Sequence, residues 1–369
     1  MKKKVLVVGQ TPPPYGGQAV MIKYMLDGDY PTMELFHVRM CFSKEFSERG
    51  KFSLYKITHL LSIIYQIWKV RFSKHVDTLY YPLSSTPKVA LLRDVIILCF
   101  TRFLFRTTIY HFHASGISEE LPKYNLFLRK ICYYILKKPS VGITSSAHNP
   151  KDAEYLQAKQ VCVIPLGIPD ENKMESRKHF GDNRYITVMF MGLLNGTKGE
   201  GYLLDAVSKV NRTGRDVRCV IAGRFESEEY EKSFMQKIKD NQLCEKVEYL
   251  GVVTGERKKN AFMSSDIFCF PTFFSSESFG IVLLEAMMYQ MPVIASRWRG
   301  VQSVVEENQN GFLVDIKNVD QIADCLIDLY DHRDKIREMG CKSRSLFVEN
   351  YELSKYLSNM ERAMTKNVL

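Results

Sequence analysis

The sequence predicts an α/β protein made of two consecutive, doubly wound, Rossmann-like domains, each built on a parallel sheet. Three observations lead to this prediction. Short β-rich segments alternate with helical segments along the chain. A polar stretch interrupts this alternation near the middle, after which the pattern starts again. The 369 residues also exceed what one hydrophobic core usually organises.

The first half opens with a buried strand at residues 4–9, followed by the loop TPPPYGG and the helical segment QAVMIKYML. Helices are also expected at residues 54–72 and in KVALLRDVIILCF and NLFLRKICYYILKK. Further strands are expected in MELFHVRM, TLYYPL, TTIYHFHA, VGITSS and QVCVIPLG. These elements define a first domain at residues 1–168.

The polar stretch IPDENKMESRKHFGDNR, at residues 168–184, is the expected domain boundary. A second domain follows at 184–349, and a C-terminal helix at about 350–369 is expected to pack back on the first domain. The expected strands are RYITVMFMG, VRCVIAG, KVEYLG, DIFCFP, PVIAS and GFLVD, with helices such as GYLLDAVSKV, EEYEKSFMQKIKD and FGIVLLEAMMYQ between them. In such folds ligands bind outside the carboxyl ends of the strands, and we expect a cleft between the two domains.

Positive charge is concentrated in the first half of the chain. Residues 1–180 hold 26 Lys and Arg against 14 Asp and Glu, whereas the remainder holds 25 against 27. This asymmetry indicates either a polyanionic partner or an anionic membrane near the first domain, or a basic surface that only aids solubility. The near-neutral second half and the absence of an RNA-binding motif argue against a nucleic-acid partner.

Cysteine usage and hydropathy exclude several classes of protein. The nine cysteines are scattered singly, with no CxxC pair and no histidines at zinc spacing, which is typical of a reducing cytoplasm. The apolar run at the N-terminus is too short for a signal peptide. No stretch of about 20 apolar residues is free of charge, so no membrane-spanning helix is expected.

The most informative segment runs from Pro271 to Asp315 and carries two glutamates, Glu277 and Glu285, eight residues apart. Phe279 and Gly280 would open a helix whose first amides form an anion site, and Gly280 would let a phosphate approach the backbone closely. Carboxylates suit vicinal hydroxyl groups, so a diphosphate between two sugars fits the layout. Taken alone, the pair fits a helix-end acid and a solvated helix residue equally well.

This segment resembles the signature of the family-four retaining glycosyltransferases, also called glycosyl transferases group 1. These enzymes have the two-Rossmann-domain fold called GT-B. The run ESFGIVLLEAM, then PVIAS, GVQSVVE and NGFLV, carries the resemblance, and weaker similarity occurs at PPPYGG, HFHAS, VIPLGIP and FMGLLNGTKG in the same order. It implies that Glu277 contacts the donor sugar, that Glu285 holds the ribose hydroxyls, and that the backbone around Gly280 cradles the diphosphate. The predicted donor contacts there are Ser278, Phe279, Gly280 and Ile281.

The loop after the first strand of the second domain, Gly192 to Gly199, offers Lys198 as a charge for phosphate. The family usually carries an arginine directly after the first glycine, and this chain has Leu193 there. Lysine does not reproduce the bidentate geometry of a guanidinium, so Arg224 or Arg297 is expected to compensate. The donor-binding prediction therefore includes Gly192, Lys198 and Arg224; the alternative for Lys198 is a solvated loop lysine.

Two features of the first domain complete the predicted site. Gly16 and Gly17 precede a helix, so their amides could point toward a ligand, although Pro- and Gly-rich turns are common and the spacing is not GxGxxG. His111 and His113 lie on one face near the end of a strand. The resemblance implies that His113 is the active-site histidine, whereas His111 fits a structural role. The predicted catalytic residues are thus His113, Glu277 and Lys198.

The expected function is transfer of a sugar from a nucleotide diphosphate sugar to a sugar or lipid-linked acceptor, in bacterial surface polysaccharide or glycolipid synthesis. The resemblance implies retention of anomeric configuration, no cofactor and no required metal, and no DxD-type pair stands at a strand end. The alternatives are a nucleotide-sugar epimerase of the same fold and a non-catalytic homologue. The first domain is expected to form the acceptor side of the molecule, and the expected location is the cytoplasm. Lys56, Lys69, Arg71 and Lys74 flank an amphipathic stretch, and NLFLRKICYYILKK is similar. Such stretches fit either a peripheral position on the inner face of the membrane or helices packed on the first sheet with basic outer faces.

Overall fold

The computed structural model describes residues 2–13, 15–42, 54–172 and 184–365, and the side chains of 54–56 are not among them. The chain divides into two compact units. Unit 1 comprises Met1–Leu166 and Leu353–Leu369, and unit 2 comprises Gly167–Glu352. Most of the polar stretch predicted as the domain boundary, residues 173–183, lies outside the described part of the chain.

Unit 1 contains a six-stranded parallel sheet with the strand order β2-β1-β3-β4-β5-β6. The strands are β1 (Lys3–Gly9), β2 (Met33–Arg39), β3 (Thr78–Pro82), β4 (Thr107–Phe112), β5 (Val141–Thr144) and β6 (Gln160–Val163). The helices are α1 (Gly17–Asp27), α2 (Leu54–Ser73), α3 (Lys88–Thr101), η2 (Arg102–Leu104), α4 (Ile117–Glu120), η3 (Leu121–Lys123), α5 (Leu126–Leu136), α6 (Asp152–Tyr155) and α13 (Leu353–Thr365).

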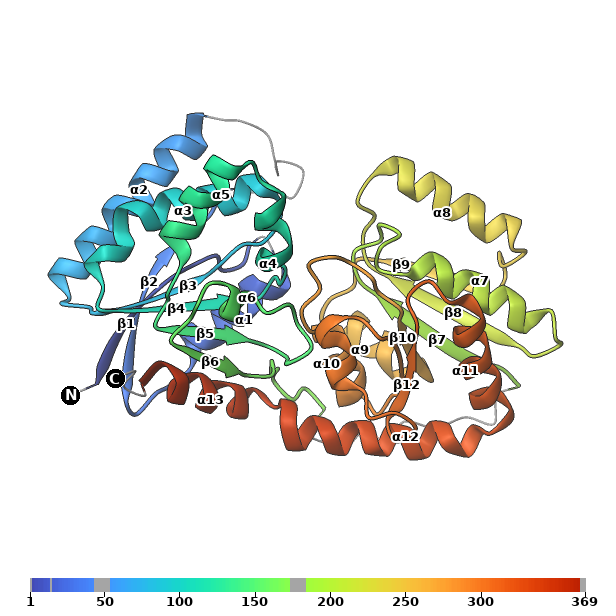
Figure 1. Ribbon diagram of the computed structural model, residues 1–369. Coiled ribbons are helices and arrows are strands. Elements are labelled where there is room, and N and C mark those ends of the chain that lie inside the picture. The colour runs from blue at the N-terminus through green and yellow to red at the C-terminus, as the bar shows by residue number, and fades with distance from the viewer. Residues whose placement is uncertain (1, 14, 43–53, 173–183, 366–369) are drawn as a thin grey trace. The chain divides into compact units, whose positions relative to one another are not determined.

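Helices α2, α3 and α5 lie side by side in one layer of unit 1 (Figure 1). Their inner faces pack on a cluster of fully buried side chains that includes Leu6, Leu79 and Tyr81. A run such as VLVV is buried along its whole length because helices cover both faces of a parallel sheet. Each helix that covers the sheet therefore needs at least one apolar stripe to bury against it.

The C-terminal helix α13 belongs to unit 1, although it follows unit 2 in the sequence. Met360 and Met364 are buried on it, and the carboxylate of Glu361 accepts hydrogen bonds of 2.8 and 2.6 Å from the amide and hydroxyl of Thr32. Tyr356 is buried on the same helix. The chain therefore completes its first unit with its last helix.

Unit 2 contains a second six-stranded parallel sheet, with the order β12-β11-β10-β7-β8-β9. The strands are β7 (Ile186–Met191), β8 (Val217–Ala222), β9 (Val247–Gly251), β10 (Ile267–Phe270), β11 (Val293–Ser296) and β12 (Gly311–Val314). The helices are α7 (Glu200–Asn211), α8 (Glu228–Asp240), α9 (Gly255–Met263), α10 (Ile281–Met288), η4 (Arg299–Val304), α11 (Val319–Asp331), α12 (Arg333–Leu346) and η5 (Phe347–Tyr351).

The predicted fold class is confirmed, because two parallel sheets with doubly wound connections stand in the predicted order. One predicted boundary is wrong. Helix α10 begins at Ile281 rather than at Phe279, and it ends at Met288. Gly280 adopts φ +82° immediately before the helix, a left-handed conformation that interrupts helical geometry and that glycine adopts without strain.

No helix among the described residues is both long and apolar enough to cross a membrane. All nine cysteines are free thiols, and three of them, Cys132, Cys219 and Cys269, are buried. Burial raises the pKa of the Cys269 thiol well above its usual value, so this cysteine stays protonated in the core. The three buried cysteines therefore act as small apolar residues of the core.

Candidate functional site

Two loops of unit 2 meet at the carboxyl ends of β7 and β10. The amide of Phe273 donates a 2.8 Å hydrogen bond to the carbonyl of Thr197, which joins the loops. Gly199 adopts φ +90°, and a Cβ atom there would lie 2.2 Å from the carbonyl oxygen of Pro271. Only glycine permits this close crossing, so the sequence at position 199 fixes how the loop that follows β7 lies against the loop that follows β10.

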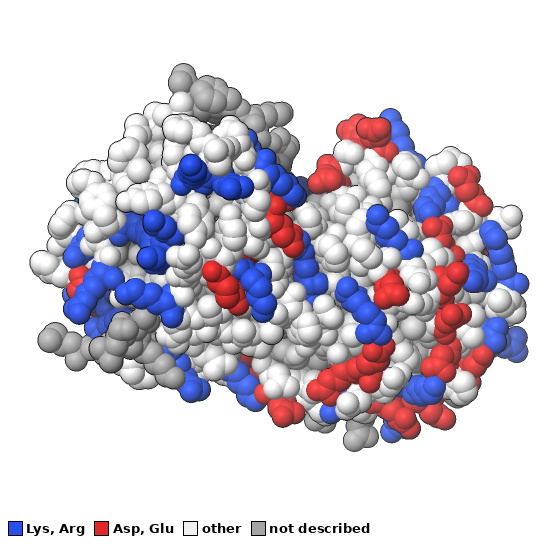
Figure 2. Space-filling view, in the orientation of Figure 1, with Lys and Arg blue, Asp and Glu red and all other residues white. Residues whose placement is uncertain are grey.

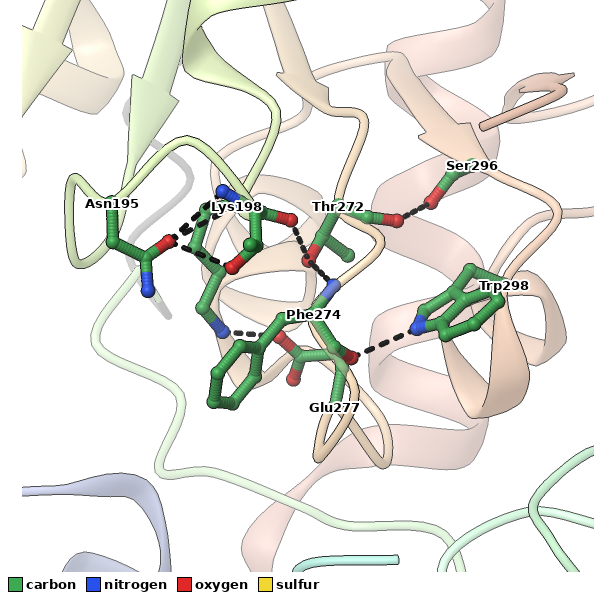
Figure 3. Close-up of polar contacts among 8 residues, drawn as sticks. Asn195, Lys198, Thr272, Phe274, Glu277, Ser296 and Trp298 are labelled. Carbon is green, nitrogen blue, oxygen red and sulfur yellow. Dashed lines mark hydrogen bonds and ion pairs between the residues drawn. The ribbon is translucent and has the colours of Figure 1, made fainter. Parts of the chain in front are cut away.

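The loop after β7 is organised by two polar side chains. The amide oxygen of Asn195 accepts hydrogen bonds from the Thr197 amide, the Thr197 hydroxyl and the Lys198 amide at 3.2, 2.9 and 3.3 Å (Figure 3). The buried carboxylate of Glu200 accepts a 2.7 Å hydrogen bond from the Gly196 amide. These contacts hold the backbone from Gly196 to Lys198, and so they restrict the direction in which the Lys198 side chain points.

Lys198 forms an ion pair with Glu277, whose carboxylate oxygen lies 2.5 Å from the ammonium nitrogen (Figure 3). The two side chains are only 15% and 12% exposed. The ammonium also lies 4.4 Å from the centre of the Phe274 ring, a cation–π distance. The predicted catalytic residues of unit 2 are therefore brought into direct contact, as a preformed cation and carboxylate with little access to water.

The loop that carries Glu277 is held by the last residue of β11 and by a residue just after it. The indole nitrogen of Trp298 donates a 2.9 Å hydrogen bond to the Phe274 carbonyl, and the Ser296 hydroxyl donates to the Thr272 carbonyl (Figure 3). Sequence reasoning missed Trp298, Ser296, Asn195 and Glu200. Ser296 could have been found from the sequence, because it is a polar residue at the end of the strand in PVIAS, and the carboxyl ends of parallel strands lie along one edge of the sheet.

The start of α10 is shaped to present backbone amides. The Leu283 amide donates a 2.9 Å hydrogen bond to the Gly280 carbonyl, so the first turn closes on Gly280. The amides of the first turn precede any acceptor within the helix and lie at the positive end of its dipole. Phe279 is buried, with its ring 6.0 Å from that of Tyr351, and Ser278 is buried beside it. Phe279 thus anchors the turn in the core, and Ile281 begins the helix as a candidate anion site.

Glu285 is partly buried on α10, with its side chain 19% exposed, and it pairs with Lys258 of α9 at 2.5 Å between carboxylate oxygen and ammonium nitrogen. Burial raises the pKa of Glu285, the positive charge of Lys258 lowers it, and the negative charge of Glu171 raises it. Lys258 was not foreseen, because α9 lies far from Glu285 in the sequence. It is the cation that favours the charged form of this partly buried carboxylate.

Of the two arginines expected to compensate for Leu193, the structure places one beside the loop. The Leu194 amide donates a 2.9 Å hydrogen bond to the Arg224 carbonyl, and Arg224 is exposed. The Arg297 guanidinium instead pairs with Glu307 at 2.8 Å, so its donors are engaged elsewhere. Gly192 lies at the start of the same loop, and its amide donates a 3.0 Å hydrogen bond to the carbonyl of Ala222, the last residue of β8.

His113 follows β4 in unit 1 and belongs to a buried polar cluster. The rings of His111 and His113 stack with centroids 3.7 Å apart. The hydroxyl of Tyr80, on β3, lies 2.7 Å from His111 Nδ1 and 3.2 Å from His113 Nε2. Burial lowers the pKa of His113 to about 3, so the ring is neutral. Tyr80 was missed by sequence reasoning and fixes the orientation of both histidines.

Gly16 and Gly17 also lie in unit 1, at the start of α1. The Val20 amide donates a 3.0 Å hydrogen bond to the Gly16 carbonyl, and a Cβ atom at Gly16 would meet nothing within 4 Å. The open space beside Gly16 is compatible with an approaching ligand. The preceding loop is held by Arg39, which donates to the Pro13 carbonyl at 2.7 Å.

Within the described ranges, no three His, Cys, Asp or Glu side chains are grouped so as to hold a metal ion. The site in unit 2 consists instead of a lysine, a glutamate and backbone amides. Its chemistry is that of an anion site with a carboxylate beside it.

Comparison with known families gives one match. A family model described as glycosyl transferases group 1 matches residues 171–346, which cover most of unit 2 and all of the Lys198, Glu277 and Glu285 region. The match excludes His113, Gly16 and Gly17.

Curated relatives match over a similar region. The chain is 33% identical to a phosphatidyl-myo-inositol mannosyltransferase of Mycobacterium leprae over 177 residues, which are 48% of this chain and 45% of the relative. It is 28% identical to a GDP-mannose-dependent alpha-(1-6)-phosphatidylinositol monomannoside mannosyltransferase of Mycobacterium tuberculosis, over 47% of this chain and 45% of the relative. The matched region therefore spans a little under half the length of these relatives.

Solved structures match over almost the whole chain. HepE of Anabaena, solved in complex with UDP-glucose, has a TM-score of 0.72 at 17% identity and covers 99% of this chain and 100% of that one. A sucrose-phosphate synthase of Thermosynechococcus elongatus has a TM-score of 0.73 at 14% identity, with 98% of each chain covered. At these identities the likeness establishes the fold, which is GT-B.

The close crossing at Gly199 predicts a stability difference between two matched glycines. Gly199 and Gly214 have φ values of +90° and +86°, but a Cβ at Gly214 meets nothing within 4 Å. Gly214→Ala should cost about 1 kcal/mol of unfolding free energy through backbone strain alone. Gly199→Ala should cost about 2 kcal/mol more, because its Cβ overlaps the Pro271 carbonyl. Urea unfolding measures the loss of unfolding free energy in each variant. Equal losses would contradict the close approach of Gly199 to the Pro271 carbonyl.

The buried histidines predict a pH dependence of stability. Burial holds the pKa values of His111 and His113 below the usual value, so the unfolded chain binds protons below about pH 6.5 that the folded chain does not. Stability is then full above about pH 6.5 and falls as the pH decreases, by up to about 1.4 kcal/mol per pH unit for each histidine. Urea unfolding between pH 8 and 5 should show a shallower slope for His111→Gln/His113→Gln. A wild-type slope in the double variant would contradict burial of the two histidines in the neutral form.

Proposed function

We propose that the protein transfers a sugar from a nucleoside diphosphate sugar to an acceptor hydroxyl, because residues 171–346 match the family model described as glycosyl transferases group 1. The observation that carries the proposal is the contact between Lys198 and Glu277 at the end of the sheet, beside the start of α10. A cation and helix amides suit a diphosphate, and a carboxylate suits sugar hydroxyls.

We propose that the donor is a hexose linked to a uridine or guanosine diphosphate. HepE was solved with UDP-glucose, and one relative is GDP-mannose-dependent. Glu285 would accept hydrogen bonds from the ribose hydroxyls, and Lys258 favours the charged form of that carboxylate. Arg224 would supply a guanidinium near the phosphates in place of the arginine that Leu193 replaces.

In the proposed reaction, the bond between the anomeric carbon and the diphosphate oxygen breaks while a bond to the acceptor oxygen forms, and the proton of the acceptor hydroxyl passes to the departing diphosphate. Lys198 and the amides at the start of α10 would stabilise the negative charge that develops on the diphosphate. Glu277 and neutral His113 would orient the sugar through hydrogen bonds. We propose retention of the anomeric configuration and no requirement for a metal.

We further propose that the acceptor is a sugar or a lipid-linked sugar, in the synthesis of a bacterial surface polysaccharide or glycolipid. Relatives named as phosphatidyl-myo-inositol mannosyltransferases support a lipid-linked acceptor. The excess of Lys and Arg in residues 1–180 supports work at an anionic surface, at the cytoplasmic face of a membrane.

The experiment has two stages. A thermal-shift screen of UDP, GDP and their hexose derivatives identifies the nucleotide, because a specific ligand stabilises the folded state by mass action. The stabilising donor is then incubated with an acceptor panel, and the anomeric configuration of the product is read by NMR. Conversion of the donor without any acceptor would indicate an epimerase, and binding without turnover over the panel would indicate a non-catalytic homologue.

Lys198→Ala should lower turnover about 100-fold or more while weakening donor binding less, because its charge acts mostly as the diphosphate departs. As a control, Lys209→Ala removes an exposed lysine that pairs with Asp320, and it should leave both the turnover number and the donor affinity unchanged. Steady-state kinetics and calorimetry separate the two effects. A Lys198→Ala variant with wild-type turnover and only weaker binding would contradict the proposed role.

Lys258→Met should make nucleotide binding depend on pH. Without its cation, the pKa of partly buried Glu285 rises further, so falling pH protonates the carboxylate and removes an acceptor for the ribose. We expect affinity for the nucleoside diphosphate about tenfold weaker at pH 6 than at pH 8 in this variant, and a smaller change in the wild type. Titration calorimetry at both pH values is the measurement, and parallel pH dependences would remove Glu285 from the ribose site.

A further inference from the structure

The outer surface of the α2–α3–α5 layer in unit 1 is apolar, which is unusual for the solvent side of a doubly wound fold. Each of these helices buries one apolar stripe against the sheet and carries a second stripe on the opposite side. The residues of the outer surface, which we call the aromatic face, are exposed. They are Ile57, Leu61, Tyr65, Trp68, Phe72, Val89, Ile96, Phe100, Phe103, Leu126, Phe127, Ile131 and Tyr134.

On α2 the outer stripe follows helical spacing without a break. Its members are Ile57, Leu61, Tyr65, Trp68 and Phe72, which are separated by three or four residues and so lie in one line along the helix. The inner stripe of the same helix contains Ile63 and Ile67, both completely buried. Because the inner stripe already satisfies the core, the fold does not explain the outer one.

The stripes of the neighbouring helices join the one on α2. The Trp68 ring lies 6.4 Å from the Phe103 ring of η2, and its indole nitrogen donates a 3.0 Å hydrogen bond to the Phe100 carbonyl. On α5, Phe127 and Tyr134 are 77% and 70% exposed. Helices α2 and α3, and α3 and α5, are in contact. The aromatic face is therefore one continuous surface rather than scattered side chains.

The charges of this layer have one sign. Helices α2, α3, η2 and α5 contain eight Lys and Arg and a single acidic residue, Asp94. Asp94 is completely buried and pairs with Arg93 at 2.7 Å, so it offers no negative charge to the surface. Figure 2 shows lysine and arginine side chains set among uncoloured surface over this layer.

We propose that the aromatic face inserts into the surface of an anionic lipid bilayer. Tyr and Trp rings with exposed Leu, Ile and Phe suit the boundary between headgroups and acyl chains, and the surrounding lysines and arginines complement anionic headgroups. An acidic protein partner would pair the charges but would not need so many exposed apolar side chains. A second copy of this chain would bring basic faces together without acidic partners. The inference concerns unit 1 alone and does not depend on the proposed sugar transfer.

The structure changes which basic residues take part. Of the four expected from the sequence, Arg71 turns inward: its side chain donates a 2.7 Å hydrogen bond to the Leu104 carbonyl and pairs with Asp77 at 2.9 Å. The side chain of Lys56 lies outside the described residues. Lys69 on α2 and Lys130 on α5 are exposed, and they are the charges to test.

The test is co-sedimentation of the full chain with vesicles of phosphatidylcholine, with and without phosphatidylglycerol, at low and high salt. Wild type should bind the anionic vesicles and retain part of that binding at high salt, because apolar insertion is not screened. Tyr65→Ser/Phe72→Ser/Phe103→Ser should weaken binding at least about tenfold at both salts. Lys69→Glu/Lys130→Glu should lose only the salt-sensitive part. Val252→Ser/Ile316→Ser/Val348→Ser, which removes exposed apolar residues of unit 2, should bind like wild type.

Trp68 reports insertion directly, because the chain contains only two tryptophans. In a Trp298→Phe variant, emission from Trp68 should shift to the blue on anionic vesicles and be quenched by lipids brominated on their acyl chains. No sedimentation with either vesicle at low salt would overturn the proposal. So would complete loss of binding at high salt without quenching, or a dimer in solution that the serine variant dissociates while vesicles remain unbound.

Discussion

The candidate site depends on the ion pair between Lys198 and Glu277. Its two residues come from loops after non-consecutive strands, β7 and β10, and these strands are neighbours only because the sheet crosses over between them. The close passage of Gly199 over the Pro271 carbonyl brings the loops together, and Asn195 and Trp298 fix their backbones. The pair is largely shielded from water, so each charge is held by the other until a ligand with competing charges arrives.

The surroundings of two further groups bias their charge state. Lys258 favours the charged form of Glu285 although burial opposes it, whereas burial favours the neutral form of His113. A carboxylate that accepts hydrogen bonds and an imidazole without charge are both suited to sugar hydroxyls, which are neutral donors and acceptors.

Sequence reasoning predicted the fold class and most of the elements, because alternating strand and helix patterns depend on local periodicity. It placed Lys198 and Glu277 in one site only through the resemblance of motifs, since their contact joins positions 79 residues apart. Lys258, Tyr80 and Trp298 could not be found from periodicity, because each acts through a contact set by the crossover order of a sheet. The regions of α2 and α5 were predicted to be amphipathic, but the sequence did not distinguish an inner from an outer apolar stripe, because that requires knowing which side of each helix faces the sheet.

The central claim is that Lys198 and Glu277 form a preformed site for a nucleoside diphosphate. Its most direct measurement is titration calorimetry of the complete chain with UDP and with GDP, in wild type, Lys198→Met, Glu277→Gln and the double variant. The account predicts saturable binding of one nucleotide, weakened at least about tenfold by Lys198→Met, and a smaller loss in the double variant than the sum of the single losses. Wild-type affinity in Lys198→Met, with purely additive effects, would contradict the account.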